Sequence, residues 1–187
     1  PAEAWTSAEF LARRGDFTDP VARLRAARQG KTEQPTLEQQ QQSWWEHLQA
    51  ADPGSQELWN RADLDDAAWD SATLPGAWAG DLAGFDGVVW YRRTVEIPQD
   101  WVQRDLVVEL GPIDDCDTFY ADGERFGATH QDGAWQAPRQ YHVAAKLVDD
   151  RNLVLAIRAV DTGGAGGLTG APEMMKIYRQ NEPASAL

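Results

Sequence analysis

Two segments in the middle of the chain alternate between apolar and polar side chains with a period of two. One face of residues 89–97 carries Val89, Tyr91, Arg93, Val95 and Ile97, and one face of residues 106–110 carries Leu106, Val108 and Leu110. Successive side chains of a strand point to opposite faces, so a period of two is typical of a strand with one buried face. The pattern therefore predicts two half-buried β-strands.

More short apolar runs follow, separated by turn residues. Phe119 and Ala121 lead into Asp122-Gly123, a strong signal for a tight hairpin, and we expect further strands at 141–143, 153–160 and 174–178. No helical pattern interrupts these runs, and Gly, Pro and Asp residues stand between them. The sequence therefore predicts a mainly β protein, an antiparallel sandwich or jelly roll.

The start of the chain carries helix signals instead. Ser7 and the pair Asp19-Pro20 are candidate helix starts, Thr36 with Gln39 resembles a capping box, and Asp52-Pro53-Gly54 reads as a stop. We therefore expect a short helical segment over residues 1–54 and a β-sandwich domain over residues 55–187.

Composition and net charge limit the kinds of partner that the chain can bind. The 187 residues include nine Trp, and the formal net charge of −13 would repel phosphate backbones and anionic lipid surfaces. We therefore expect no nucleic acid or membrane partner; a neutral ligand such as a sugar suits the charge better. The lone Cys116 allows no internal disulfide, and a start at Pro1 without an initiator Met suggests a processed or excised fragment.

Two groups of charged residues invite a structural or a functional reading. Asp114, Asp115 and Asp117 could hold a hard cation such as Ca²⁺, but a solvated turn with one Asp pairing an arginine is the favoured reading, so no metal site is assigned. Arg93 shares a face with Tyr91 and other apolar residues. We expect it to be buried and paired with one of these carboxylates.

No catalytic set is expected within the chain. His47, His130 and His142 are scattered, and none of the serines stands in a nucleophile motif. The run from Gly163 to Gly167 lacks the Lys-Ser/Thr ending of a phosphate-binding loop, so we interpret it as a loop that bends sharply or approaches another surface closely. Most of the tryptophans should be core residues, but two or three could stack on a sugar, and the candidates for this are Trp78, Trp90 and Trp135.

A family resemblance rests on several of these segments. The segments around Asp65-Asp66-Ala67-Ala68-Trp69, residues 86–93, Asp122-Gly123 and residues 152–158 resemble the sugar-binding jelly roll of family-two glycoside hydrolases. Gly111-Pro112-Ile113-Asp114-Asp115, residues 161–164 and Gly170-Ala171-Pro172-Glu173-Met174 are closer still to the β-sandwich inserted in bacterial sialate O-acetylesterases of the SGNH type. The start, residues 1–7, is similar to the segment that follows the Gly-Gly block of that esterase fold.

The resemblance implies a galactose-binding-like sandwich that is an accessory part of a larger hydrolase. The parent would hydrolyse O-acetyl esters on sialic acid or a related sugar, with its nucleophilic Ser before Pro1 and its Asp-His pair after Leu187, so the chain alone carries no catalytic residue and needs no cofactor. Its partners would be the flanking SGNH esterase domain, on which residues 1–54 would pack, and an O-acetylated carbohydrate. The resemblance favours a periplasmic or secreted location.

It also implies which residues contact the sugar. In the family-two glycosidases, residues before the Trp-Tyr-Arg strand and at the end of the late strand reach the sugar, so the expected contacts are Asp86, Trp90, Asp161, Gly163 and Gly164, while Arg93, Asp114 and Asp115 would be structural. Two alternatives remain: an independent carbohydrate-binding module, and the amino-terminal domain of a glycosidase.

Overall fold

The computed structural model describes residues 22, 26, 35–130, 133–180 and 185–186. The chain divides into two compact units, residues 1–47 and residues 48–187. The helix starts expected at Ser7 and at Asp19-Pro20 lie outside the described residues. Within the described part, no helix is long and apolar enough to span a membrane.

The helix α4 (Leu37–Ala51) begins with the predicted capping box. Gln39 N donates to Thr36 Oγ1 at 3.1 Å, and Thr36 N donates to Gln39 Oε1 at 2.8 Å. After α4, Asp52 caps a second short helix, α5 (Pro53–Gln56), by accepting a hydrogen bond from Gly54 N, and Pro53 occupies the first turn. The predicted stop at Asp52-Pro53-Gly54 is therefore also the start of a new helix.

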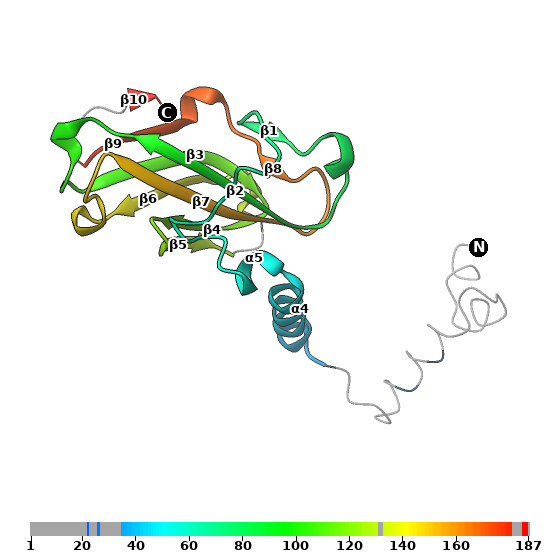
Figure 1. Ribbon diagram of the computed structural model, residues 1–187. Helices are drawn as coiled ribbons and strands as arrows, with labels where there is room; N and C mark the ends of the chain where they lie inside the picture. Colours follow the sequence, from blue (N-terminus) through cyan, green and yellow to red (C-terminus); the bar gives the residue numbers. More distant parts are fainter. Residues whose placement is uncertain (1–21, 23–25, 27–34, 131–132, 181–184, 187) are drawn as a thin grey trace. The chain divides into compact units, whose positions relative to one another are not determined.

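Two antiparallel sheets form the sandwich, which confirms the predicted fold class (Figure 1). The six-stranded sheet contains β1 (Gly76–Ala77), β8 (Gly167–Leu168), β3 (Leu106–Asp114), β9 (Met175–Arg179) and β10 (Ser185–Ala186) in that order, with β6 (Pro138–Val143) on the other side of β3. The four-stranded sheet has the order β2 (Gly87–Glu96), β7 (Asn152–Asp161), β4 (Cys116–Ala121) and β5 (Glu124–Thr129). Short 3₁₀ turns connect the strands: η2 (Gly80–Leu82), η3 (Gln99–Trp101), η4 (Ala134–Gln136), η5 (Ala145–Leu147) and η6 (Pro172–Met174).

The core lies between the two sheets. In β3 the predicted inward residues Leu106, Val108 and Leu110 are at most 1% exposed, but Val107 on the other face is also buried, at 3%, so β3 is buried on more than the one predicted face. Phe119 of β4 and Tyr141 of β6 stack with ring centroids 4.7 Å apart, so an aromatic pair joins one sheet to the other. Asp122 and Gly123 form the turn between β4 and β5, as expected.

The strand register brings several loops to one end of the sandwich. Gly87 at the start of β2 pairs with Asp161 at the end of β7, and Cys116 at the start of β4 pairs with Val160. Asp115, directly after β3, donates its N–H to Val160 O at 2.9 Å. We call this end the Asp161 end. It places the loop before β2 and the loop after β7 side by side (Figure 1).

Candidate functional site at the Asp161 end

The two loops that sequence reasoning selected do lie at the same end. Asp86 precedes β2, Gly163 and Gly164 follow β7, and all three residues are exposed. Asp161 itself is 0% exposed, and its Oδ1 accepts a hydrogen bond from Gly163 N at 3.2 Å. Asp86 and the two glycines can therefore meet a ligand, whereas Asp161 cannot touch a sugar directly. The prediction that Asp161 is a contact residue is wrong in that respect, because the β7 end turns this side chain inward.

Three carboxylates meet beneath these loops. Each of Asp114, Asp115 and Asp161 offers an oxygen, and the three oxygens lie within 4.8 Å of one another. Asp115 is anchored, because its Oδ2 accepts from Thr162 N at 3.0 Å and from Thr162 Oγ1 at 2.6 Å. This contact ties the end of β3 to the end of β7. Asp114 is half-buried beside it.

The crowding perturbs the proton equilibria of the three groups. Burial raises the pKa of the Asp114 carboxyl to about 6, and the neighbouring carboxylates of Asp115 and Asp161 add to the rise. Burial also raises the pKa of Asp161, against the hydrogen bond from Gly163 N, and the charges of Asp115 and Asp86 reinforce the rise. Burial alone would raise the pKa of Asp115 too, but the hydrogen bonds from Thr162 lower it. The cluster therefore concentrates negative charge that lacks full compensation.

The third aspartate of the predicted loop, Asp117, faces the core instead. Its Oδ1 accepts from Arg139 Nε at 2.6 Å, and its Oδ2 accepts from the Tyr141 hydroxyl. Both Asp117, at 0%, and Arg139, at 2%, are buried. A buried arginine does pair with an aspartate of this loop, as expected, but it is Arg139 of β6.

The prediction of a buried, carboxylate-paired Arg93 is wrong. Arg93 is exposed, although it follows Tyr91 on the same face of β2. The reason is topological, since β2 lies at the edge of its sheet and, among the described strands, pairs with β7 alone. Beside it opens a cleft of about 380 Å³, lined among others by Trp69, Asp70, Ser71 and Arg93. Arg93 therefore belongs to a surface cleft and not to the core.

Arg139 also fixes the position of an exposed tryptophan at the Asp161 end. Its Nη2 donates to Ile113 O at 2.7 Å and to Asp115 O at 2.9 Å, and its Nη1 donates to Ala134 O at 2.6 Å. The guanidinium thus joins the turn after β3 to η4, which contains Trp135. The indole of Trp135 is 46% exposed. Of the three tryptophans proposed from sequence for sugar stacking, Trp135 has an accessible face at this end.

Trp90 and Trp78 are both buried. Trp90 is 8% exposed, stacks on Tyr120 with centroids 5.7 Å apart, and donates Nε1–H to Asp52 Oδ1 at 3.1 Å. Trp78 is 7% exposed and donates its indole N–H to the Tyr91 hydroxyl at 2.6 Å. The prediction that Trp90 contacts a sugar is therefore wrong, because its ring is enclosed on the outer face of the four-stranded sheet.

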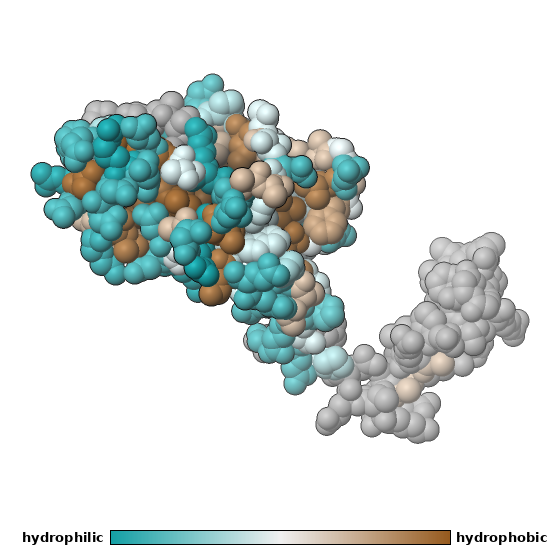
Figure 2. Space-filling view, viewed as in Figure 1, coloured by the Kyte–Doolittle hydropathy of each residue, from teal (hydrophilic) through white to brown (hydrophobic). Residues whose placement is uncertain are grey.

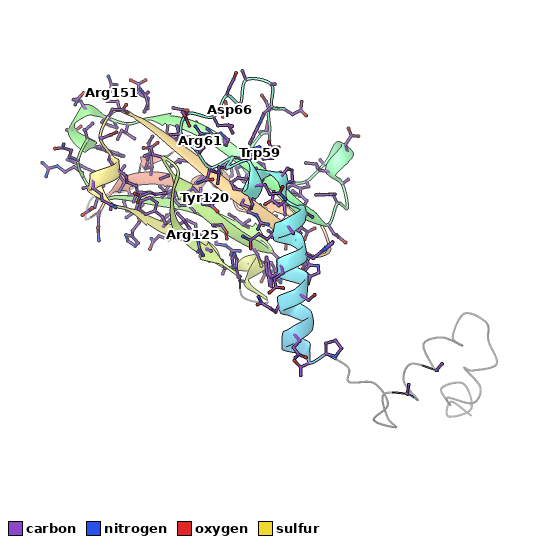
Figure 3. All side chains as sticks on the ribbon, turned by 60° about the horizontal axis from the view of Figure 1, so that its bottom comes forward. Trp59, Arg61, Asp66, Tyr120, Arg125 and Arg151 are labelled. Atoms are coloured by element: carbon purple, nitrogen blue, oxygen red, sulfur yellow. The ribbon has the colours of Figure 1, made fainter. Side chains whose placement is uncertain are left out.

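That outer face is covered by the segment after α5, to which Trp59 and Asp66 belong (Figure 3). Trp59 meets Trp90 edge-on with centroids 6.3 Å apart. Arg92 of β2 donates to Trp59 O at 2.7 Å and to Asp66 Oδ2 at 2.9 Å. The segment is therefore part of the sandwich unit and shields the face of β2 and β7 from which Trp90 and Arg158 project.

Most of the visible surface of the sandwich is hydrophilic, with apolar residues showing between (Figure 2). Among the described residues, the exposed large apolar side chains include two aromatic rings at the Asp161 end, Phe85 at 41% and Trp135 at 46%. Phe85 directly precedes Asp86. The exposed groups of this end thus combine two aromatic rings, one carboxylate and a glycine loop.

Comparison with known proteins identifies the class of fold. No protein-family model matches the chain, and no curated protein sequence matches it. Among solved structures, a β-glucuronidase from glycoside hydrolase family 2 superposes with a TM-score of 0.51 at 16% identity over 60% of this chain and 15% of that one. The Bacteroides uniformis β-glucuronidase gives a TM-score of 0.50 at 22% identity, with 58% of this chain and 14% of that chain covered.

The Ruminococcus gnavus β-glucuronidase gives a TM-score of 0.50 at 14% identity, covering 59% of this chain and 18% of that chain. At such identities the similarity establishes the shared β-sandwich fold alone. The chain spans less than a fifth of the length of each of these three enzymes. It thus has the fold of a β-sandwich that also occurs within family-two β-glucuronidases.

Proposed function

We propose that this chain is a non-catalytic accessory domain of a carbohydrate-active hydrolase and that its Asp161 end faces the sugar. The observation that carries the proposal is the gathering of exposed groups suited to a sugar at one end of the sandwich: Asp86, the loop of Gly163 and Gly164, and the ring of Trp135. A carboxylate accepts hydroxyl hydrogen bonds, an aromatic face packs on the apolar face of a pyranose, and glycines let backbone amides approach closely.

The finer proposal concerns the catalytic partner. The resemblance of residues 111–115, 161–164 and 170–174 to the sandwich inserted in sialate O-acetylesterases supports an esterase parent, whereas the shared fold with family-two β-glucuronidases supports a glycosidase parent. The sequences that flank this chain in its gene distinguish the two. A Gly-Gln-Ser-Asn-like block upstream would mark an esterase, and an acid/base Glu downstream would mark a glycosidase.

Sugar binding by the full 187-residue chain tests the location of the site. Titrations followed by ligand-observed NMR would use methyl β-glucuronide and an O-acetylated sialic acid as probes. We expect Trp135→Ala and Asp86→Ala to weaken binding by about tenfold, a change of about 1.4 kcal/mol. Arg93→Ala, in the cleft beside β2, is the matched control and should leave binding unchanged.

The outcomes separate the remaining alternatives. Binding by the isolated chain that depends on Trp135 and Asp86 indicates an independent carbohydrate-binding module. Binding that appears only when the catalytic domain is joined to it, and that weakens in the same variants, indicates an accessory domain that completes a shared site. Binding lost in Arg93→Ala but kept in Trp135→Ala and Asp86→Ala would overturn the assignment to the Asp161 end.

A further inference from the structure

The acidic cluster beneath the sugar-facing loops has a feature that a solvated turn does not have. Asp161 is 0% exposed, and its Oδ2 is a buried oxygen that has no hydrogen-bond partner among the described residues. An unpaired buried carboxylate oxygen is costly, because desolvation of a charge must be offset by hydrogen bonds, by a counter-charge or by a metal. Such an oxygen calls for a partner, which can be a water, a shared proton or a bound cation.

The neighbours of Asp161 increase the cost. Oxygens of Asp114 and Asp115 lie within 4.8 Å of an oxygen of Asp161, and the negative charge of Asp86 also acts on Asp161. Like charges at this range repel strongly in a half-buried setting. The nearby cation, Arg139, relieves this repulsion only in part: its charge acts to lower the pKa of Asp114, but its Nε pairs with Asp117 and its contact with Asp115 is to the backbone oxygen.

The spacing suits one shared cation. Ligand oxygens lie about 2.3 to 2.6 Å from a Ca²⁺ ion, so two ligands of the same ion can be at most about 5 Å apart. The limit of 4.8 Å among the three carboxylate oxygens satisfies this pairwise condition. Ca²⁺ accepts six to eight oxygens in irregular geometry, and solvent can complete the shell because Asp114 and Asp115 are only half-buried.

The Thr162 contacts orient the site. Thr162 N and Oγ1 hold Asp115 Oδ2, and Gly163 N holds Asp161 Oδ1, so two of the three carboxylates are fixed with one oxygen each still available. Hydrogen bonds that hold the ligating carboxylates in place increase the affinity of a site for its metal. We propose that Asp114, Asp115 and Asp161 form a binding site for a hard divalent cation, Ca²⁺ in preference to Mg²⁺, which ties the end of β3 to the end of β7.

Binding of the cation at this site does not require a sugar. Asp117 is not part of the site, because it pairs with Arg139, and Asp161 is the third carboxylate beside Asp114 and Asp115. The ion would fix the loop that carries Gly163 and Gly164, but it would bind whether or not a sugar is present.

Calorimetric titration of the EDTA-treated full chain with CaCl₂ tests the site. We expect saturable binding with a dissociation constant of about 10⁻⁴ to 10⁻³ M, and a higher melting temperature in excess Ca²⁺ than in EDTA. Asp161→Asn and Asp114→Asn should each weaken binding at least tenfold. MgCl₂ should bind more weakly than CaCl₂.

The matched control is Asp63→Asn, which removes one charge from an exposed surface pair with Arg61 and should bind Ca²⁺ like the wild type. It separates a specific site from general attraction of cations to a chain of net charge −13. Without Ca²⁺, the Asp114→Asn variant should be at least as stable as the wild type, because it removes repulsion, and this half-exposed position keeps the test valid if Asp161→Asn fails to fold. Absence of a Ca²⁺-dependent heat and melting shift in the wild type, or wild-type affinity for Ca²⁺ in both Asp161→Asn and Asp114→Asn, would overturn the proposal.

Discussion

The carboxylate of Asp52 accepts a hydrogen bond from Arg158 Nε at 2.6 Å across 106 residues of sequence. Asp52 is 3% exposed and Arg158 is 7% exposed, so the pair is shielded from water. Asp52 also accepts hydrogen bonds from Ser55 Oγ at 2.7 Å and from the Trp90 indole. The residue that caps α5 is therefore bonded to the middle of β7.

The first prediction concerns this pair. Asp52→Asn leaves the Arg158 guanidinium buried without a counter-charge, so we expect a loss of about 3 to 5 kcal/mol in the free energy of unfolding. Urea denaturation followed by tryptophan fluorescence measures the loss. The control is Asp63→Asn, which breaks the exposed pair with Arg61, also 2.6 Å long, and should leave stability essentially unchanged. Equal effects of the two substitutions would show that burial does not distinguish the pairs.

The same pair predicts a pH dependence. Burial alone would raise the pKa of Asp52, but the hydrogen bonds from Arg158, Ser55 and Trp90 hold it below the ordinary value of 3.8. A carboxyl whose pKa is lowered by folding stabilises the native state above the unfolded pKa and loses this contribution as the pH falls through the folded pKa. The stability difference between wild type and Asp52→Asn should therefore be constant from about pH 7 to about pH 5 and shrink below about pH 4. A difference that already changes near neutral pH would contradict this.

The third prediction compares the stability cost of losing Arg139, which is buried, with that of losing Arg93, which the sequence predicts to be buried but which is exposed. Arg139→Met leaves Asp117 buried and without its guanidinium, and it removes the donors to Ile113 O and Ala134 O, so we expect a loss of about 3 to 5 kcal/mol. Arg93→Met, at an exposed site, should cost less than about 1 kcal/mol. Chemical denaturation of both variants checks the ranking, and the reverse order would show that the assignment of the two faces is wrong.

A fourth prediction isolates a steric contact in the loop after β7. A Cβ at Gly166 would lie 2.3 Å from a ring carbon of Trp78, and the residue has φ +60°. Gly166→Ala should therefore destabilise the fold by about 1 to 3 kcal/mol, because the buried indole has to move. Gly164→Ala is the control, since Gly164 also has a positive φ, +115°, but has open space around it. A melting temperature that falls as far in Gly164→Ala as in Gly166→Ala would assign the effect to the backbone alone.

The alternation of apolar and polar residues predicts where the strands lie, but it does not predict how far each face of a strand is buried. The alternation in β2 places Arg93 on the face of Tyr91, yet it carries no information about the sheet order that leaves β2 at an edge. The signal for Arg139 was present, because Arg139, Tyr141 and Val143 alternate and all are buried. It was missed because the strand was expected to begin at residue 141, two residues after Arg139.

For the candidate site too, the sequence predicts which loops lie together but not which way their side chains point. Motif resemblance placed Asp86 and Asp161 at one end, and the pairing of Gly87 with Asp161 confirms this. The inward turn of Asp161 and the use of Asp117 by Arg139 depend on contacts between strands far apart in sequence, so a local pattern cannot reveal them. Asp52 was interpreted as a helix stop from its Pro-Gly context, and its second role, as partner of Arg158, requires the folded sandwich.

The bond between Asp52 and Arg158 also decides how the sandwich bears a mechanical load. The chain enters the sandwich unit just before Asp52, and Asp52 is attached to β7, which has β2 on one side and β4 on the other. A tension applied through α4 would meet this ion pair before it reached β1 and the edge strand β2, which follow Asp52 along the chain, so the pair would have to break before those strands could be peeled away. In a pulling experiment Asp52→Asn should therefore lower the force at which the sandwich begins to yield.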